Sequence, residues 1–394
     1  MRRSTWGTRV AAAIVAAIVL AACGGGGDDG GGGGGEQAAP ETTAGTVDAM
    51  EAAIAARDRA FEGTNGAIDA TARPAADGKH VVVISTGQGS ISSQIPSDAA
   101  VEAAKAIGWD VDLYDAELNP SNYAPLVRQA IAAGADGIVL DAIDCQTVQQ
   151  PLKEAQAKGI VVIPIYAFDC NDPHAGGAEE GLFTDIINYG EELADIPAFT
   201  EKYGADQASY IIAASDNTAK ILAIQDPEFT VLYYTLEGFR KTIEAAGGAE
   251  IVSTLEVTVS DLTTGKLVPK IQAELLRHPE VTWIKAPYTY ITTLGIIPAL
   301  GANPNKIKVM GGEGFLPELD LLREGKIDAV NIVSSEWTAW AAIDSMNSVF
   351  RDEKPVYSGL GWQIADADHN VPPSGDLVPD VDFRAAYKQA WGVD

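Results

Sequence analysis

Short apolar runs bounded by turn residues recur along the chain, and helical patterns separate them. In the first half these runs cover residues 80–85, 109–114, 136–140 and 160–165. The runs at 80–85, 136–140 and 160–165 are continuous rather than alternating, which is typical of strands buried on both faces. Strands of this kind that alternate with helices form a parallel sheet with helices on both sides. The pattern therefore predicts an α/β fold.

The segments between the runs carry helix boundary signals. Asn119 and Pro120 provide a cap and a first-turn proline for one helix. Gly134 and Gly159 stand where two helices should end, because glycine accepts the left-handed conformation of a helix C-terminus. Strands and helices are therefore expected to alternate along this half of the chain.

The same alternation returns after a glycine-rich break at residues 176–181. The strands predicted there are residues 209–213, 251–257, 282–285, 306–310 and 329–333. Two such halves make two doubly wound parallel-sheet lobes, and a chain of 394 residues is long enough for both. Ligands bind outside the carboxyl ends of the strands in sheets of this kind. We therefore expect a cleft where the lobes face each other.

The N-terminus has the pattern of a secretory signal. Three arginines within the first nine residues precede an apolar run over residues 10–22, which is shorter than the roughly 20 residues that span a bilayer. Residues 20–23 (LAAC) resemble the lipobox of bacterial lipoproteins. That resemblance implies that residues 1–22 are removed and that Cys23 is acylated. The alternative is an ordinary signal peptide with a chance cysteine.

A glycine-rich stretch follows this cysteine. Residues 23–46 are predicted to be the acylated cysteine and a flexible tether, because such a composition buries nothing. Residues 47–78 are predicted to hold an alanine-rich helix and a polar linker. No later segment has the pattern of a membrane-spanning helix. We therefore expect an exported protein anchored by its lipid to the extracytoplasmic face of the membrane.

The charge balance narrows the classes of partner. The formal net charge is −28. Nucleic acid phosphates and anionic membrane surfaces both require lysine and arginine, so neither is an expected partner. Hydrophobic residues make up 46% of the chain, so that disorder is not expected outside the tether.

Two cysteines remain if Cys23 is lipidated, and an even number in an exported protein permits one disulfide. Cys145 and Cys170 each lie just beyond a strand, and these two strands are expected to be neighbours in the first sheet. Their Cα atoms should then lie within the ~4.4–6.8 Å range of a disulfide. The alternative is a pair of reduced, buried thiols.

Several segments resemble a known family. They are VVVIS at residues 81–85, IAAGADGIVLDAIDCQTVQQPLKEA at 131–155, GIVVIPI at 159–165, LEGFRKTIEAAG at 236–247 and VMGGEGFLPELDLLREGKIDAV at 309–330. In their order and spacing they resemble type I periplasmic binding proteins of the ribose-binding group, over roughly residues 79–357. The resemblance implies two lobes that close over one ligand, and a closed form that docks on an ABC permease.

The resemblance also implies the lobe boundaries. Three crossovers are expected, near residues 183–185, 334–335 and 357–358. The first lobe would then comprise residues 79–184 and 335–357. The second lobe would comprise residues 185–334 and 358–394. The protein is expected to be a monomer.

The candidate ligand-binding residues are those that follow the predicted strands. They are Gln88, Ser90, Asp144, Tyr166, Phe168, Asp169, Tyr233, Tyr288, Tyr290, Glu313 and Trp337. Aromatic faces with a few carboxylates suit a neutral, sugar-like or ring-bearing molecule, or a cation. No Arg or Lys directly follows the strands of the first lobe, which disfavours an anion. Tyr166 and Ala167 stand where the family has an Asp-Arg pair, so ribose itself is not favoured.

An enzyme is the rival class. The chain has no G-x-S-x-G or H-E-x-x-H motif, and we predict a binding protein that has no cofactor. The acids Asp141 and Asp144 leave a carboxylate-based glycosidase as one alternative, and a ligand-sensing partner of a membrane receptor as another. Asp169 begins a calcium-like spacing that Pro173 and His174 interrupt, so no metal site is expected.

Overall fold

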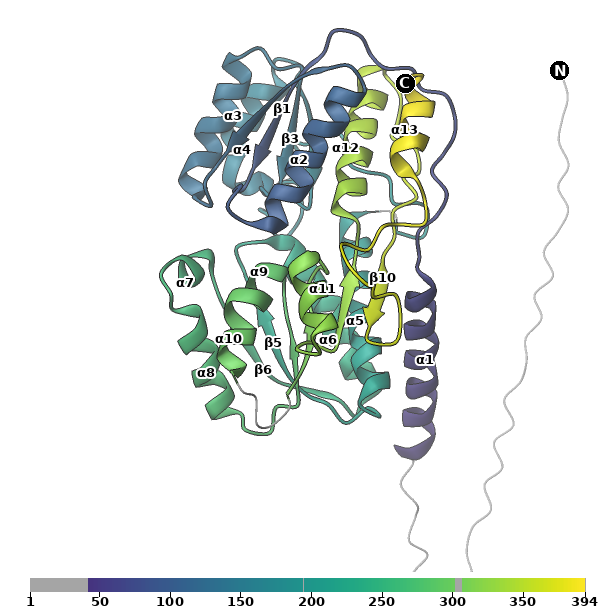
Figure 1. The fold of residues 1–394 in the computed structure, drawn as a ribbon. Coiled ribbons are helices and arrows are strands. Elements are labelled where there is room, and N and C mark those ends of the chain that lie inside the picture. The colour runs from purple at the N-terminus through teal and green to yellow at the C-terminus, as the bar shows by residue number, and fades with distance from the viewer. Residues whose placement is uncertain (1–41, 194, 302–306, 394) are drawn as a thin grey trace, which may run out of the picture. The chain divides into compact units, whose positions relative to one another are not determined.

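Two α/β lobes form the part of the chain that the structure describes (Figure 1). The structure is a computed structural model, and it describes residues 42–193, 195–301 and 307–393. The predicted signal peptide, Cys23 and most of the predicted tether lie outside these ranges. The helix expected from residue 47 begins earlier, as α1 (Thr42–Glu62). Within the described ranges, no helix combines the length and apolar character needed to cross a membrane.

The first lobe is built on a four-stranded parallel sheet with the order β2-β1-β3-β4. Its strands are β1 (His80–Ser85), β2 (Asp110–Asp115), β3 (Gly137–Asp141) and β4 (Val161–Ile165). Val81 of β1 pairs with Val111 on one side and Gly137 on the other. Each strand matches its prediction to within one residue at either end. Strands β1, β3 and β4 are apolar on both faces, whereas β2 is an edge strand with mostly exposed residues.

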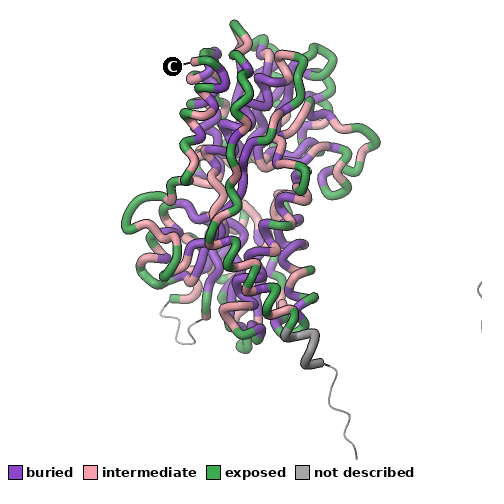
Figure 2. Tube along the Cα trace, turned by 90° about the vertical axis from the view of Figure 1, so that its right-hand side faces the viewer, coloured by how far each residue is buried: buried purple, intermediate pink, exposed green. Residues whose placement is uncertain are grey.

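Helices cover both faces of this sheet. They are α2 (Ile91–Ala106), α3 (Tyr123–Ala132), α4 (Cys145–Gln156), α12 (Ser335–Phe350), α13 (Phe383–Trp391) and a short 3-10 turn at Pro120–Asn122. Val81 and Val83 pack with α2 and α12, whereas Val82 and Ile84 pack with α3 and α4. Figure 2 shows the buried residues concentrated inside each lobe. Continuous apolar strands are explained by this two-sided burial.

The second lobe holds a six-stranded sheet with the order β10-β9-β8-β7-β5-β6. Its strands are β5 (Lys220–Gln225), β6 (Glu250–Glu256), β7 (Trp283–Lys285), β8 (Lys308–Gly311), β9 (Ala329–Ile332) and β10 (Gln363–Asp366). All pairs are parallel except β10 with β9, which is antiparallel. Its helical segments are α5 (Ile196–Ala214), α6 (Thr230–Ala246), α7 (Val259–Thr263), α8 (Leu267–Arg277), α9 (Thr289–Ile291), a π-helical turn at Thr292–Ile296, α10 (Ile297–Leu300) and α11 (Leu316–Arg323).

One predicted strand of this lobe is wrong. Residues 209–213 lie in α5, and the strand stands later, as β5. Helix α5 is packed between α1 and α6, and most of its residues are buried. A helix buried on nearly all sides has the same continuous apolar pattern as a buried strand, so periodicity does not separate the two.

The C-terminal segment does not stay in the second lobe as expected. Strand β10 pairs with β9 there, but α13 returns to the first lobe and packs on α12 (Figure 1). Trp391 of α13 stacks on Trp340 of α12 with ring centroids 5.4 Å apart. The assignment of all of residues 358–394 to the second lobe is therefore wrong for α13, because these aromatic rings are buried against the first lobe.

Four segments connect the lobes. Asn188 and Tyr357, on two of the expected crossovers, form an isolated parallel bridge. The third runs from β9 to α12, and Ser334 caps that helix. The fourth is residues 63–79, which we call the strap. It leads from α1, packed on α5 and β10 of the second lobe, to β1 of the first lobe (Figure 1).

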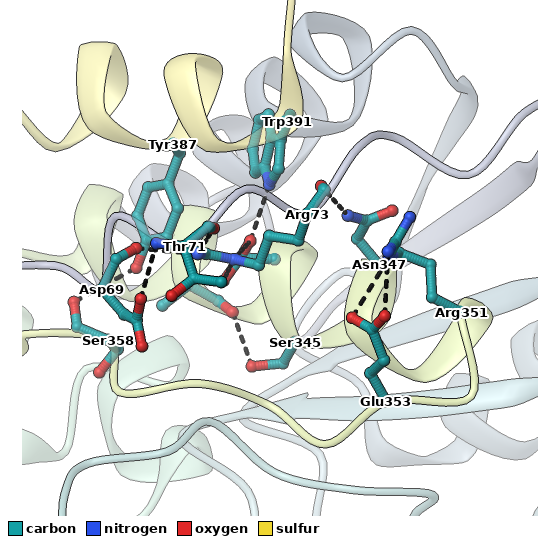
Figure 3. A network of polar contacts seen from close by, with 12 residues as sticks. Asp69, Thr71, Arg73, Ser345, Asn347, Arg351, Glu353, Ser358, Tyr387 and Trp391 are labelled. Carbon is teal, nitrogen blue, oxygen red and sulfur yellow. Dashed lines mark hydrogen bonds and ion pairs between the residues drawn. The ribbon is translucent and has the colours of Figure 1, made fainter.

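The strap is fixed at both ends. Near the second lobe, the Gly66 amide donates to the Gly359 carbonyl at 2.8 Å. Near the first lobe, the Arg73 amide donates to the Ala390 carbonyl at 2.8 Å. The buried Arg73 guanidinium donates from Nε to Asp344 Oδ1 on α12 at 2.7 Å. Asn347 of the same helix donates from Nδ2 to the Arg73 carbonyl at 3.0 Å (Figure 3). These contacts join the strap to the segment before β10, and to α12 and α13.

Helices α5 and α6 cross with their backbones in close contact, and a glycine on each helix permits this. A Cβ at Gly204 would lie 1.9 Å from the Thr235 carbonyl oxygen, and one at Gly238 would lie 1.9 Å from the Glu201 carbonyl oxygen. Real Cβ atoms do not approach oxygen so closely. The backbones must separate before either glycine can be replaced.

Replacing Gly238 with alanine should therefore destabilise the protein by about 1–3 kcal/mol or more, the usual cost of overpacking. On an exposed helix the same substitution raises the free energy of unfolding by up to about 1 kcal/mol. The sign of the change therefore tests whether the backbones of α5 and α6 are in close contact at Gly238. Urea unfolding measures it. Gly89→Ala is the control, because a Cβ there meets nothing within 4 Å. An unfolding midpoint of Gly238→Ala at or above that of the wild type would contradict the packing.

Candidate functional site

A cavity of about 130 Å³ lies between the lobes. Its first-lobe wall follows β1, β3 and β4, and its second-lobe wall follows β5, β7, β8 and β9. The residues that line it are Ser90, Ser92, Ser93, Leu118, Ala142, Tyr166, Tyr189, Ile196, Phe199, Thr200, Tyr203, Phe229, Val231, Leu232, Thr235, Val259, Leu262, Pro287, Tyr288, Tyr290, Gly312, Glu313, Val333 and Ser335. The cavity therefore stands at the carboxyl ends of the strands, as the doubly wound pattern predicts.

Hydrogen bonds join the two lobes across this cavity. Ser92 Oγ of α2 donates to Glu313 Oε2 after β8 at 2.6 Å. Thr230, the first residue of α6, donates from Oγ1 to Asp144 Oδ2 at 2.6 Å. At the rim, Tyr234 donates from its hydroxyl to Asp172 Oδ2 at 2.7 Å. The lobes are thus in direct polar contact on both sides of the cavity.

Glu313 is held by the loop after β8. The buried Glu318 carboxylate accepts the amides of Gly312 at 2.8 Å and Gly314 at 2.7 Å, which shapes that loop. Glu313 Oε2 also accepts the Thr289 amide at 2.9 Å. Burial raises the pKa of Glu313 to about 7, although the Ser92 and Thr289 hydrogen bonds oppose this. Glu313 lines the cavity, and both of these hydrogen bonds go to Oε2.

Three tyrosines place their rings at the cavity and bind their hydroxyls within the protein. The Tyr166 hydroxyl lies 3.0 Å from Ser335 Oγ. The Tyr203 hydroxyl donates to the Gly312 carbonyl at 2.8 Å. The Tyr288 hydroxyl donates to Asp226 Oδ2 at 3.0 Å, and burial raises the pKa of Asp226 to about 7. These tyrosines therefore offer ring surface to a ligand.

Five of the predicted binding residues line the cavity: Ser90, Tyr166, Tyr288, Tyr290 and Glu313. Each of them lies just beyond the carboxyl end of a strand, which is the position from which the sequence predicts binding residues.

The other predicted residues support the site from outside the cavity. Gln88 donates from Nε2 to Ser85 Oγ at 3.0 Å. Asp144 bridges to α6, as described above. Phe168 is buried and stacks on Tyr234 with centroids 5.1 Å apart. Tyr233 stacks on His174 at 3.8 Å.

Trp337 lies in the core of the first lobe. Its side chain is fully buried, its Nε1 donates to the Ser358 carbonyl at 3.0 Å, and it stacks on Phe383. The structure therefore places Trp337 away from the cavity. The reason is that α12 turns this residue toward α13, whose place in the first lobe was not expected.

Asp141 and Asp144, the acids considered for a glycosidase, are both engaged. Asp141 is fully buried and accepts Ser97 Oγ at 2.7 Å. Asp144 accepts the Phe168 amide at 2.8 Å and the Thr230 hydroxyl. Burial raises the pKa of both acids. Neither acid lines the cavity. Asp144 contacts the second lobe, whereas Asp141 lies in the first lobe with its Oδ1 buried and without a hydrogen-bond partner among the described residues.

Cys145 and Cys170 form a disulfide, with Cα atoms 5.0 Å apart. This is the pairing expected from the neighbouring strands β3 and β4. Asp169 beside it uses its carboxylate as a backbone acceptor, from the Leu182 amide at 2.6 Å and the Phe183 amide at 3.1 Å. The disulfide and Asp169 together fix the loop after β4.

Much of the cavity wall was not predicted. Tyr189 lies on a crossover, Phe199 and Tyr203 lie on α5, and Phe229 and Leu232 lie at the start of α6. None of these residues directly ends a strand. The signal available in the sequence was the aromatic and aliphatic content at the N-terminus of α6, which follows β5 after a short turn.

The sequence profile of the periplasmic binding protein domain matches residues 81–354. No curated protein matches the chain in a sequence search.

Solved structures of similar fold are ABC transporter solute-binding proteins. One from Agrobacterium vitis, bound with alpha-D-tagatopyranose, has a TM-score of 0.63 at 18% identity and covers 75% of this chain and 97% of its own. One from Mycobacterium smegmatis with bound glycerol has a TM-score of 0.61 at 21% identity and covers 77% of this chain and 100% of its own. A periplasmic ribose ABC transporter protein from Conexibacter woesei has a TM-score of 0.56 at 22% identity and covers 72% and 90%. At these identities the likeness establishes the fold, and the predicted fold class is confirmed.

Proposed function

The chain belongs to the periplasmic binding protein family, and from this premise we propose that it is the extracytoplasmic solute-binding subunit of an ABC importer. It captures one small neutral or cationic molecule between its lobes and delivers it to a membrane permease. The observation that carries the proposal is the interlobe cavity, whose walls are joined by the Ser92–Glu313 hydrogen bond. The Asp144–Thr230 hydrogen bond joins the lobes outside the cavity. A ligand held there contacts both lobes and so favours the closed arrangement.

The proposal includes the N-terminal segment. Cys23 carries the acyl anchor, and the glycine-rich residues that follow it form the tether. Export then places the folded body on the outer face of the membrane, where a monomer can meet its ligand and its permease. The bound sugar and polyol in the Agrobacterium and Mycobacterium proteins support a small uncharged ligand. Neither Asp141 nor Asp144 lines the cavity, which supports binding without hydrolysis.

The test is a ligand screen by thermal shift on the chain from residue 24 onward. A ligand at 100 times its dissociation constant should raise the free energy of unfolding by about 2.7 kcal/mol, which corresponds to a Tm rise of about 5 °C or more for a body of this size. Small-angle scattering with the hit should report a more compact particle.

Glu313→Ala should reduce the Tm rise by about half or more, because loss of the carboxylate that faces the cavity weakens the binding of the ligand by roughly tenfold or more. Glu244→Ala is the matched control, since Glu244 is exposed on α6 away from the cavity. A hit that is chemically converted would replace the binding-protein proposal with an enzyme. A hit that binds equally well to Glu313→Ala would place the ligand elsewhere.

A further inference from the structure

The cavity wall lacks the polar groups that a free sugar needs. Among the described residues that line it, none is Arg, Lys, His, Asp, Asn or Gln, and Glu313 is the only carboxylate. A monosaccharide or polyol carries a hydroxyl on most of its carbons. Each hydroxyl that loses water in a closed cleft without a protein partner weakens binding. The wall therefore offers too few hydrogen bonds for such a molecule.

Many hydroxyl groups of the wall are already bonded within the protein. Besides the three tyrosine hydroxyls described above, Ser92 donates to Glu313. Thr200 donates from Oγ1 to the Ile196 carbonyl at 2.8 Å, and Thr235 donates to the Val231 carbonyl at 2.8 Å. The hydroxyls of Ser90, Ser93, Tyr189 and Tyr290 remain on the wall, and these four are few for a molecule that carries a hydroxyl on most of its carbons.

The remaining wall is apolar and comes largely from the second lobe. Phe229 and Leu232 begin α6, and Val259 and Leu262 belong to α7. Leu118 faces them from the first lobe. A cavity of about 130 Å³ is close in size to the ~150 Å³ apolar cavity that holds a benzene ring. Tyrosine faces on such a wall pack well against a flat ring.

One polar anchor stands in this apolar surface. Both hydrogen bonds that the described residues make to the Glu313 carboxylate go to Oε2. Oε1 is therefore left as an acceptor for an N–H or O–H of a ligand. A single acceptor in an apolar pocket fixes the orientation of a ligand that has one donor group.

We propose that the cleft takes a mainly apolar, ring-bearing molecule with a single hydroxyl or amino group, which donates to Glu313. The proposal rests on the function proposed above, since it assumes that the cleft is the ligand site. It narrows that function by excluding free monosaccharides and polyols. The hydroxyl and the amine share the same hydrogen-bond chemistry, and the experiment separates them.

The experiment measures binding to the chain from residue 24 onward by calorimetry. The probes are phenol, benzylamine, benzene and benzoate, together with ribose, tagatose and glycerol. Phenol or benzylamine should bind, and benzene should bind roughly tenfold more weakly because it cannot donate to a carboxylate. Benzoate should not bind because the wall offers no cation, and the three polyhydroxylated probes should not bind because the wall offers too few partners for their hydroxyls.

Variants assign the binding to this wall. Glu313→Leu should weaken the donor-bearing probe by roughly tenfold or more. Glu313→Gln keeps an acceptor but loses the charge, so it should retain phenol and lose benzylamine. Leu232→Ser leaves the acid in place and should weaken both ring probes several-fold through lost apolar contact. The Tm of each ligand-free variant shows whether the variant is folded.

The outcomes separate the two proposals. Binding of ribose, tagatose or glycerol without the ring probes would overturn the ligand class and leave the binding function standing. Failure of all ring probes would also overturn the ligand class. Binding of ring probes that is unchanged in both Glu313→Leu and Leu232→Ser would show a site outside the cleft, and would remove the support for both proposals.

Discussion

Replacing Arg73 with methionine should lower the free energy of unfolding by about 3–5 kcal/mol, the usual cost of leaving one partner of a buried ion pair alone. The Arg73 and Asp344 side chains are only 2% and 4% exposed. Arg73 Nε donates to both Asp344 oxygens, at 2.7 and 3.0 Å, and the guanidinium also donates to the Asp69 and Thr71 carbonyls. The variant leaves the buried Asp344 carboxylate with Trp391 as its remaining donor.

A double-mutant cycle isolates the pair. Asp344→Leu alone should also destabilise strongly, whereas Arg73→Met combined with Asp344→Leu should cost less than the sum of the two, because no unpaired charge remains. Arg128→Met is the matched control. Arg128 and Glu154 form an exposed pair, with side chains 48% and 47% exposed, and such pairs contribute about 0–1 kcal/mol. Equal urea unfolding midpoints for Arg73→Met and Arg128→Met would show that the Arg73–Asp344 pair does not contribute to the stability of the fold.

Removing both Cys145 and Cys170 by alanine substitution should destabilise the protein by about 3–4 kcal/mol. The two cysteines are 25 residues apart in sequence, and the chain-entropy model gives roughly this value for a loop of that length. In that model, the stability is lost mainly because the unfolded chain gains conformational entropy when the disulfide is absent. The same variant should also loosen the loop after β4, because Asp169 and Phe168 stand directly before Cys170.

Urea unfolding without reductant compares the double variant with the wild type. The wild type should then lose a similar amount of stability when reductant is added, and the double variant should not respond. A wild-type midpoint that is indifferent to reductant, together with two titratable thiols in the denatured protein, would show that these cysteines are not joined.

The sequence predicted the elements that sit in a regular environment. Strands β1, β3 and β4 are apolar on both faces because helices cover both sides, and that pattern has few alternative interpretations. Helix α5 escaped prediction for the same physical reason. Its surroundings bury it on nearly all sides, so residues 209–213 look like a strand when their neighbours in space are not known.

The site was predictable only where it depends on strand ends. Tyr166, Tyr288 and Glu313 follow strands, and the sheet brings them to one edge whatever the details of the lobes. Trp337 illustrates the limit, because its direction depends on α13, which follows the second-lobe sheet in sequence and returns to the first lobe. Tyr203 reaches the cavity from the helix that was taken for a strand. Long-range packing of this kind has no signal in local periodicity.

The strap changes what kind of joint connects the two lobes. A rotation of one lobe against the other must twist every segment that passes between them. The strap is bonded near Gly66 to the segment before β10, and near Arg73 to α12 and α13. Only the few residues between these points can take up that twist. The connection between the lobes therefore acts as a hinge of limited range. The angle through which the lobes can rotate is set by how far the residues between Gly66 and Arg73 can change conformation.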